Sequence, residues 1–420
     1  MTKEITIINF RSKLLWAKLI TILIILASVR GILIVNFDFN ANLVYLTTAF
    51  LMLLVSLYGF FIRFSFYAPS FIVLRNILKL NLVFGIVNIG VDLLLGIAFS
   101  PAMLYLFIAP YIVFVFFKIP EKYLHVVVVI ISVLISYSVI INFIDTISGP
   151  EGVQRVLDFN MKLRPDIFQA LSKTGEFYRA SGYTGNYHDS ANILGMTAVY
   201  FYSRFIIRRH SVDLLYFLFA TSALFLTQSA ANIIILIFML LIISIFMFIK
   251  LKGNSKIIFI TIIYLFIYLL WHIYGDYFGV FIQRINQVDS WQNIVNNSAA
   301  QGSFISELLL VITGHAAGFE SESIHTEIGL YGTILQLGIF HAIIFFSLML
   351  YPLWRYINLK IACFDAIPSL SAVIFGFASL LHYGSITRIT SVYLFYVFFS
   401  LSITSMVRHA QIANKNFRKL

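Results

Sequence analysis

The chain has 420 residues, of which 60% are hydrophobic and only 11% are charged, and its mean hydropathy of +0.92 excludes a soluble domain. Soluble chains carry roughly 25% charged residues, so this composition leaves too few polar side chains to cover a water-exposed surface. The excess apolar surface must face lipid, as in a polytopic membrane protein. The single cysteine, Cys363, excludes a disulfide framework and a cysteine-based zinc site.

Apolar runs of about 17 to 25 residues predict twelve transmembrane helices. They lie near residues 15–35, 43–62, 80–98, 101–117, 123–144, 190–207, 213–227, 230–249, 257–275, 327–350, 366–383 and 390–407. The first run is too long for a signal-peptide core and has no small-residue cleavage site, so we expect a retained span. Because the chain has no internal repeat and no low-complexity linker, residues 1–420 are predicted to form a single all-α membrane domain.

The distribution of charge predicts the orientation of this domain. If the N-terminus is cytoplasmic, most of the 29 basic residues fall on that side, against four acidic residues, Glu4, Glu121, Asp213 and Asp365. The positive-inside rule is then obeyed at every loop, which predicts that both termini lie in the cytoplasm. The net charge of +11 is thereby explained by topology and anionic lipid headgroups, without a nucleic-acid partner.

Two connections, residues 145–189 and 276–326, are much longer than the others, and both are predicted to lie on the extracytoplasmic side. Connections of that length in a compact protein are usually functional or disordered. Because the second contains Trp291 and the apolar run Leu308 to Ile312, we expect both loops to fold as lids with short helices.

Ionisable side chains inside a bilayer are costly and often mark function. The apolar runs hold few of them: Arg30, Asp92, His272, His341 and His382. For each we expect snorkelling towards the interface or a satisfied hydrogen bond inside the helix bundle. Since there is no series of buried carboxylates, the sequence gives little support to an ion-coupled transporter.

The first polar cluster runs from Arg179 to Asn192 and leads into an apolar helix. Asp189 or Ser190 is the expected N-cap, and Gly182 and Gly185 permit tight backbone turns before it. A helix N-terminus with an arginine ten residues upstream is able to bind phosphate through backbone N–H groups and the guanidinium. The alternative is a capped helix with solvated neighbours.

The second polar cluster runs from Gly314 to Glu327, where the second long loop meets the next predicted span. His325 is able to accept a hydroxyl proton at neutral pH, and the carboxylate of Glu327 stands two residues later. The alternative is that His325 caps the helix or forms a hydrogen bond at the membrane interface.

The order of these features resembles the O-antigen polymerase and O-antigen ligase superfamily of bacterial membrane glycosyltransferases over roughly residues 175 to 345. The resemblance is carried by Arg179-x-x-Gly182 before a span, a Leu226-Thr227-x-Ser229 helix junction, Arg284 and Trp291 early in a large outer loop, Gly314-x-x-x-Gly318, His325-x-x-x-x-Leu330, and Gly338-Ile339 in the next helix. No single element is specific for this superfamily. The ordered set, together with twelve spans and two long outer loops, is more specific for it.

The resemblance implies an all-helical, GT-C-like glycosyltransferase that uses undecaprenyl-diphosphate-linked sugars and needs no metal or other cofactor. Its partners would be a lipid-linked oligosaccharide, the bilayer, a chain-length regulator and a flippase. In this reading His325 or Glu327 is catalytic, and Arg179 and Arg284 bind the diphosphate. The chain has Ser229-Ala230 where relatives often have Ser-Arg, so Arg284 or Arg388 is expected to supply the missing cation.

The function that follows from the resemblance is a repeat-unit polymerase for O-antigen, capsule or exopolysaccharide, acting with inversion at the anomeric carbon. Two alternatives remain. One is the ligase that transfers finished glycan to lipid A core, although relatives of that kind often have His-Asn where this chain has His325-Thr326. The other is a lipid-linked oligosaccharide flippase or another transporter.

Overall fold

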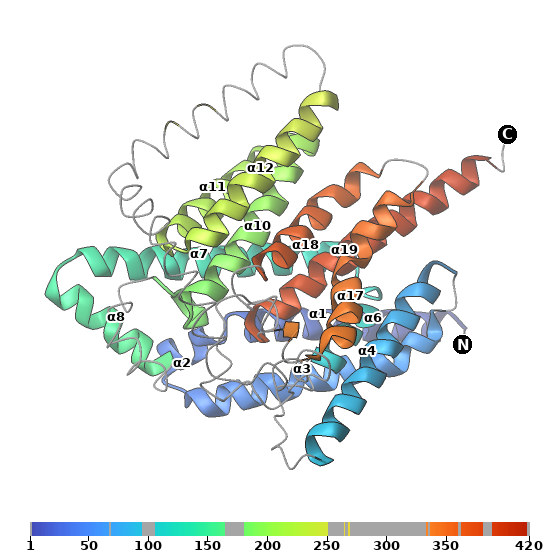
Figure 1. Ribbon diagram of the computed structural model, residues 1–420, viewed down its shortest axis with the longest axis horizontal. Helices are drawn as coiled ribbons and strands as arrows, with labels where there is room; N and C mark the ends of the chain where they lie inside the picture. The colour runs from blue at the N-terminus through green and yellow to red at the C-terminus, as the bar shows by residue number, and fades with distance from the viewer. Residues whose placement is uncertain are drawn as a thin grey trace.

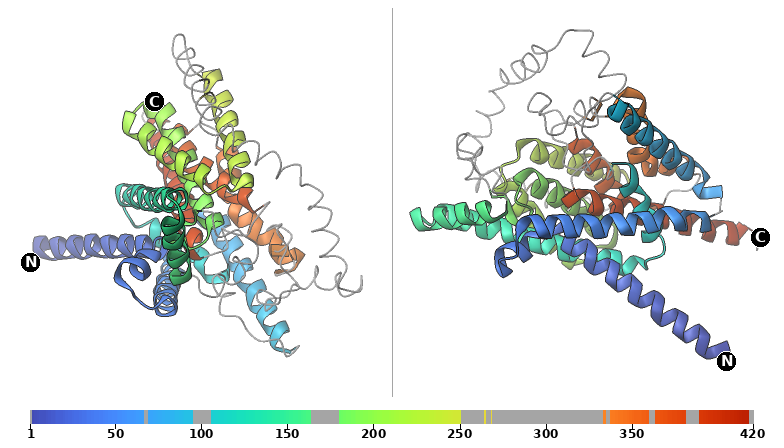
Figure 2. Two further views of the ribbon diagram at one scale, coloured as in Figure 1. Left: turned by 90° about the vertical axis from the view of Figure 1, so that its left-hand side faces the viewer. Right: turned by 90° about the horizontal axis from the view of Figure 1, so that it is seen from below.

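The computed structural model describes residues 2–66, 69–94, 106–163, 180–250, 264, 268, 333–334, 337–359, 363–380 and 389–417. Within these residues every regular element is a helix, and no strand is present, which confirms the predicted all-α class. The helix bundle is drawn in Figures 1 and 2.

The described helices are α1 (Thr2–Ser28), α2 (Gly31–Phe37), α3 (Ala41–Ile62), α4 (Pro69–Leu94), α6 (Ile112–Phe116), α7 (Glu121–Ile147), α8 (Pro150–Leu163), α10 (Tyr187–Arg208), α11 (Ser211–Leu226), α12 (Ala230–Lys250), α17 (Ile339–Ile357), α18 (Ile367–Ser379) and α19 (Ile389–Phe417). Of these, α3, α7, α10, α11 and α12 match predicted spans to within a few residues. In contrast, α4 begins well before the predicted start at residue 80, and α19 continues well past the predicted end at residue 407. Short 3₁₀ turns join them: η1 (Arg63–Ser65), η2 (Ala109–Tyr111), η4 (Gly182–Thr184) and η6 (Phe364–Ala366).

Several helices are long and apolar enough to cross a membrane. Among the described residues five qualify by length and composition: Ala41–Ser65, Phe71–Val91, Glu121–Ile147, Ile339–Ile357 and Ser391–Ile412. The bent pair α1 and α2 makes a sixth if it is counted as one span, and four shorter apolar helices accompany them. These helices are typical of a membrane protein. The count of twelve, the sidedness of the loops and the location of the termini stay predictions.

The first predicted span, residues 15–35, is not one straight helix. The chain bends by 72° between α1 and α2. A Cβ on Gly31 would lie 2.1 Å from the carbonyl oxygen of Tyr183, so the start of α2 is in direct backbone contact with the η4 turn. Arg30, at the bend, places its guanidinium 4.0 Å from the centre of the Tyr45 ring. Because the bend depends on tertiary contacts and not on local hydropathy, hydropathy alone predicts a single straight span here.

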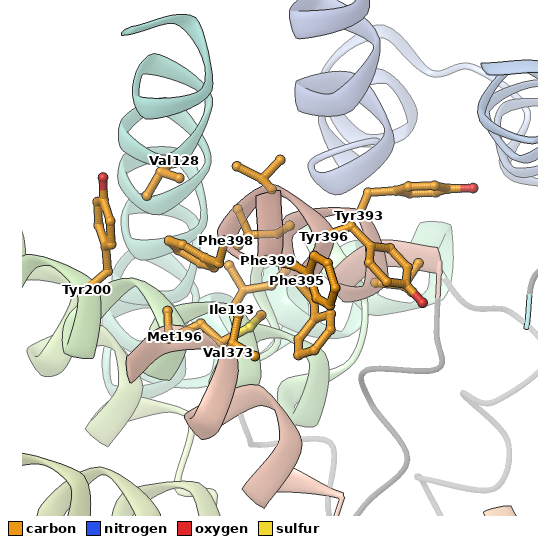
Figure 3. Packing of buried hydrophobic residues seen from close by; sticks show 14 of the residues in the cluster. Val128, Ile193, Met196, Tyr200, Val373, Tyr393, Phe395, Tyr396, Phe398 and Phe399 are labelled. Carbon is orange, nitrogen blue, oxygen red and sulfur yellow. The ribbon is translucent and has the colours of Figure 1, made fainter. Parts of the chain in front are cut away.

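The core lies where α7, α10, α18 and α19 meet. Almost every residue of α10 is buried, which is the pattern of a helix surrounded on all sides. Figure 3 shows Phe395, Phe398 and Phe399 of α19 packed against Ile193 and Met196 of α10. The packing of α10 against α11, α12 and α18 is the scaffold on which the polar segments before and after α10 are held.

The described part of the first long connection contains a helix, α8, which extends to one end of the molecule in Figure 1. Its buried residues, Gly152, Val156, Asn160 and Leu163, recur at helical spacing on one face. That face packs on α7 and α2. The second long connection, residues 276–326, lies outside the described residues.

Candidate functional site

The five residues that the sequence singles out for catalysis and diphosphate binding all lie outside the described part of the chain. They are His325, Glu327, Arg179, Arg284 and Arg388. The part of the first polar cluster that the structure describes runs from Ala180, directly after Arg179, to Asn192. The geometry of that cluster and of the helices around it is therefore the starting point for a site.

The N-cap of α10 is Asn186, and the prediction of Asp189 or Ser190 is wrong. The Asn186 side chain, on an extended backbone, accepts a hydrogen bond of 2.8 Å from the His188 N–H. The helix therefore begins at Tyr187, and Asp189 lies in its first turn, where a carboxylate is stabilised by the helix dipole. Amide and carboxylate caps have similar propensities, so the sequence does not decide between neighbouring candidates.

The tight backbone expected before α10 is present. Gly182 and Gly185 have φ angles of +57° and +70°, on either end of the η4 turn. A Cβ on Gly182 would lie 2.5 Å from the Ser138 hydroxyl oxygen, which in turn accepts a 3.0 Å hydrogen bond from the Tyr183 N–H. Gly182 is thus required both for its left-handed backbone and for the close approach of the turn to α7.

Hydroxyl groups fix the turn between α8 and α10. The Ser181 hydroxyl donates a buried 2.8 Å hydrogen bond to Asn160 of α8, and the Thr184 hydroxyl lies 2.8 Å from that of Ser190 in α10. The Ser190 hydroxyl also donates to the Ser181 carbonyl. Because the buried hydroxyls are satisfied by partners on both helices, this corner is a rigid support. In sequence, the predicted diphosphate ligand Arg179 stands two residues before Ser181.

Beside this corner lies a cavity of about 480 Å³, which we call the α7–α8 hollow. Four elements form it: the C-terminal half of α7, one face of α8, the end of α2 and the η4 turn. Its walls are Val35, Asn36, Tyr137, Ser138, Ile141, Asn142, Asp145, Arg155, Asp158, Phe159, Lys162 and Tyr183. The hollow is thus built mainly from the first long connection and the helix before it.

Ion pairs hold α8 over the hollow. The guanidinium of Arg155 contacts one carboxylate oxygen of Asp145 through two nitrogens, at 2.8 Å and 2.7 Å. Lys162 forms an ion pair of 2.5 Å with Asp38, next to the end of α2. Pairs this exposed contribute at most about 1 kcal/mol each, so the charges can turn to a ligand at little cost.

Asn142 is the most informative wall residue. Its side chain is 3% exposed, and in the part of the chain that the structure describes its Nδ2 has no hydrogen-bond partner. A buried N–H₂ without a partner costs about 1–3 kcal/mol. Because Asn142 lines the hollow, a ligand oxygen placed there would recover that energy.

The other walls suit a sugar ring. Tyr137, Phe159 and Tyr183 present aromatic surface, on which the apolar C–H face of a pyranose can pack, while Asp158 and Asn36 offer acceptors and donors to hydroxyl groups. Asn36 and Tyr183 already form a weak contact, 3.4 Å from Nδ2 to the phenol oxygen. Tyr137, Ile141 and Asp145 share one face of α7 at i, i+4 spacing, the one sequence signal that points to this wall.

A second set of polar groups lies at the α11–α12 junction. The chain turns between Leu226 and Ala230, with Gln228 at φ +55°, where the resemblance places a helix junction. In α12, which packs beside α10, Asn232 donates a 3.0 Å hydrogen bond to Ser229, and its buried Oδ1 has no partner in the described part of the chain. The fully buried Asn192 of α10 has no partner for either polar atom among the described residues.

Fold and site together define the class: an all-helical membrane protein with a polar hollow at the end of one apolar helix and, within the residues that the structure describes, buried amides without a hydrogen-bond partner. No group of three or more His, Cys, Asp or Glu residues suited to a metal ion is found within the described ranges. Comparison of the chain with family models, with curated proteins and with solved structures gave no match. Inferences about function therefore depend on the chain's own residues and on the sequence resemblance.

Proposed function

We propose that the chain is a repeat-unit polymerase of the bacterial inner membrane, and that the α7–α8 hollow binds part of the glycan of its undecaprenyl-diphosphate-linked substrate. The observation that carries the proposal is the composition of the hollow: aromatic walls, carboxylates, cations and the unpaired Nδ2 of Asn142. These are the groups that a sugar requires, and they lie at the end of the apolar helix α7.

The proposed reaction is a single displacement. The acceptor is a hydroxyl of a lipid-linked repeat unit, and its oxygen attacks the anomeric carbon of the growing glycan. The bond from that carbon to the diphosphate oxygen breaks, and undecaprenyl diphosphate leaves with the bonding electron pair. The configuration at the anomeric carbon is inverted, and the acceptor proton passes to a base on the protein.

Residues outside the described ranges are proposed to carry the chemistry. His325 takes the acceptor proton, with Glu327 as the competing candidate, while Arg179 and Arg284 stabilise the charge that develops on the diphosphate. Arg388 is the further candidate cation. Arg179 stands two residues before Ser181, whose hydroxyl anchors the α8–α10 corner, and this spacing connects the diphosphate ligand to the proposed glycan site along the chain.

The test uses the purified full-length protein in liposomes that contain lipid-linked repeat units and no lipid A core. A polymerase makes a ladder of products under these conditions. A ligase makes product only after lipid A core is added, and a flippase moves the substrate across the bilayer without forming a glycosidic bond. Either of the last two results contradicts the proposal.

The role of His325 is tested by His325→Ala, with Glu327→Gln as the matched control. A single general base contributes roughly 10² to 10⁴ in rate, so the alanine variant should lose that factor while its thermal stability is unchanged. Wild-type activity in His325→Ala together with loss in Glu327→Gln would move the base to the carboxylate.

A further inference from the structure

A second polar site lies at the opposite end of α7 from the hollow. There Arg204 of α10 forms an ion pair with Asp213 of α11, with 3.1 Å between Nε and the carboxylate oxygen. The two side chains are only 12% and 5% exposed. The same guanidinium uses Nη1 to contact the Tyr200 hydroxyl at 3.3 Å and His125 Nδ1 at 3.2 Å. Figure 3 shows Tyr200 at the margin of the core, with its hydroxyl directed away from the phenylalanines.

These contacts determine the protonation of His125. A guanidinium N–H only donates, so Nδ1 of His125 must be the acceptor and carries no hydrogen. The Tyr200 hydroxyl, 3.2 Å from the same nitrogen, is the second donor in reach. A neutral imidazole with Nδ1 unprotonated has its proton on Nε2, so His125 offers one N–H donor on its other side.

A cavity of about 260 Å³ adjoins this cluster, and we call it the α7–α18 pocket. Its walls are Glu121, Lys122, His125, Tyr200, Arg204, Arg208, Asp365, Pro368, Ser369, Leu401 and Ser405. Among the described residues no hydrogen bond is formed by Nη2 of Arg204 or by Nε2 of His125, and no carboxylate lies within ion-pair distance of Lys122. Three donors on the walls are therefore available to a ligand.

The electrostatics of the pocket favour an anion. Its two carboxylates are already engaged, Glu121 by Arg408 and Asp365 by Arg208 at 3.6 Å. Residues of the first turns of two helices, α7 and α18, also line the pocket, so the positive ends of both helix dipoles are near it. Arg204 is likewise paired with Asp213, so within the described residues Lys122 is the positive charge left over, and Arg204 adds a free N–H donor through Nη2.

The position of the pocket indicates where the anion comes from. Glu121 is the first residue of an apolar helix long enough to cross a membrane, so we expect the pocket to lie where that helix would meet the membrane boundary. The positive-inside pattern predicts that this boundary is the cytoplasmic one, which is rich in anionic lipid. The volume accommodates a phosphate group, and Leu401 adds an apolar wall.

We propose that the α7–α18 pocket is a binding site for the phosphate group of an anionic membrane lipid, held by Arg204, His125 and Lys122. The site is separate from the α7–α8 hollow and does not depend on the proposed polymerase activity. Bound lipid would join α7, α10 and α18 and thereby stabilise the bundle.

The test measures the thermal stability of the full-length protein in phosphatidylcholine nanodiscs, alone, with phosphatidylglycerol added to the lipid, or with millimolar inorganic phosphate in the buffer. We expect phosphatidylglycerol to raise the midpoint and inorganic phosphate to leave it unchanged. The variant Lys122→Gln/Arg208→Gln alters exposed side chains and should bind short-chain phosphatidylglycerol in detergent roughly tenfold more weakly.

The matched control is Arg155→Gln/Lys162→Gln, which removes the same charge at the α7–α8 hollow and should keep the full response to phosphatidylglycerol. His125→Phe keeps a ring but removes the Nε2–H donor, and should reduce the response. No rise in the midpoint when phosphatidylglycerol is added to the phosphatidylcholine nanodiscs, or an equal loss of the response in the control variant, overturns the proposal. A full shift with inorganic phosphate shows a soluble-phosphate site and overturns the assignment to lipid.

Discussion

The imidazole Nε2 of His341 in α17 donates a 3.1 Å hydrogen bond to Oδ1 of Asn81 in α4, across 260 residues of sequence. The other ring nitrogen, Nδ1, lies 3.2 Å from Nδ2 of Asn88, which is about two turns further along the same face of α4, and accepts a hydrogen bond from it. Both asparagines also donate to backbone carbonyls, those of Leu106 and Leu337. The satisfied hydrogen bond expected for a histidine in an apolar run is thus confirmed for His341.

This network predicts that His341 stabilises the fold. His341→Leu keeps the apolar volume but leaves the Asn81 acceptor without a partner in a dry interior, at a cost of about 1–3 kcal/mol. The thermal midpoint should fall, while the activity per folded molecule is unchanged. His210→Gln, at an exposed position before α11, is the control and should leave the midpoint as it is. A loss of activity without a loss of stability would contradict this role.

The predicted helices agree with the structure wherever a long apolar run packs as one straight segment, as in α3, α7, α10 and α12. Length and hydropathy are enough to predict these helices, because in lipid the backbone N–H and C=O groups must form their hydrogen bonds within the helix. The break at Arg30 could not be predicted in this way. It depends on contact between Gly31 and the backbone of Tyr183, which is a tertiary contact without any local signal.

The candidate site was predictable only in part. The turn at Gly182 and Gly185 could be inferred, because few other residues adopt a positive φ. The α7–α8 hollow could not, since it combines Asn36, Asn142 and Tyr183 from segments far apart in the chain. Its most informative feature, an unpaired buried amide, is a property of packing rather than of sequence.

Asn192 is predicted to lower the thermal stability of the protein and to be required for its activity. The side chain is fully buried and unpaired within the described residues, so Asn192→Leu removes an unsatisfied amide and should raise the thermal midpoint. If the amide contacts substrate, the same change abolishes polymer formation. Asn81→Leu is the matched control, because its amide is paired and its loss should lower the midpoint. A stabilised and fully active Asn192→Leu protein would show that the Asn192 amide does not contact the substrate.

If the α7–α8 hollow binds the glycan, substitutions of its wall residues should weaken substrate binding without slowing turnover. Tyr137→Ala and Asn142→Ala remove contacts proposed to hold the glycan away from the reacting bond, so KM for the lipid-linked substrate should rise roughly tenfold with kcat little changed. Tyr58→Ala, at an exposed tyrosine of α3 outside the hollow, should leave both constants unchanged. Unchanged KM values in both hollow variants would show that the glycan binds elsewhere.

Gly182 is predicted to be irreplaceable. Gly182→Ala forces a side chain into a left-handed backbone and against the Ser138 hydroxyl, which should destabilise the protein by about 1–3 kcal/mol. Gly90→Ala is the control. A Cβ on Gly90, inside α4, would meet nothing within 4 Å, and alanine favours a helix by about 0.5–1 kcal/mol. In chemical denaturation, the free energy of unfolding should be lower than that of the wild type for Gly182→Ala and higher for Gly90→Ala.

The single cysteine allows the predicted topology to be tested in the wild-type chain. Cys363 is buried, and burial raises the pKa of its thiol, so little of the reactive thiolate forms at neutral pH. A membrane-impermeant maleimide should therefore leave the folded protein unlabelled and label it after denaturation. On this background, Glu176→Cys and Ser298→Cys should react in intact cells, because both lie in loops predicted to face out. Arg209→Cys and Asn254→Cys should react only after permeabilisation, and the reverse pattern at either pair would contradict the orientation derived from the positive-inside rule.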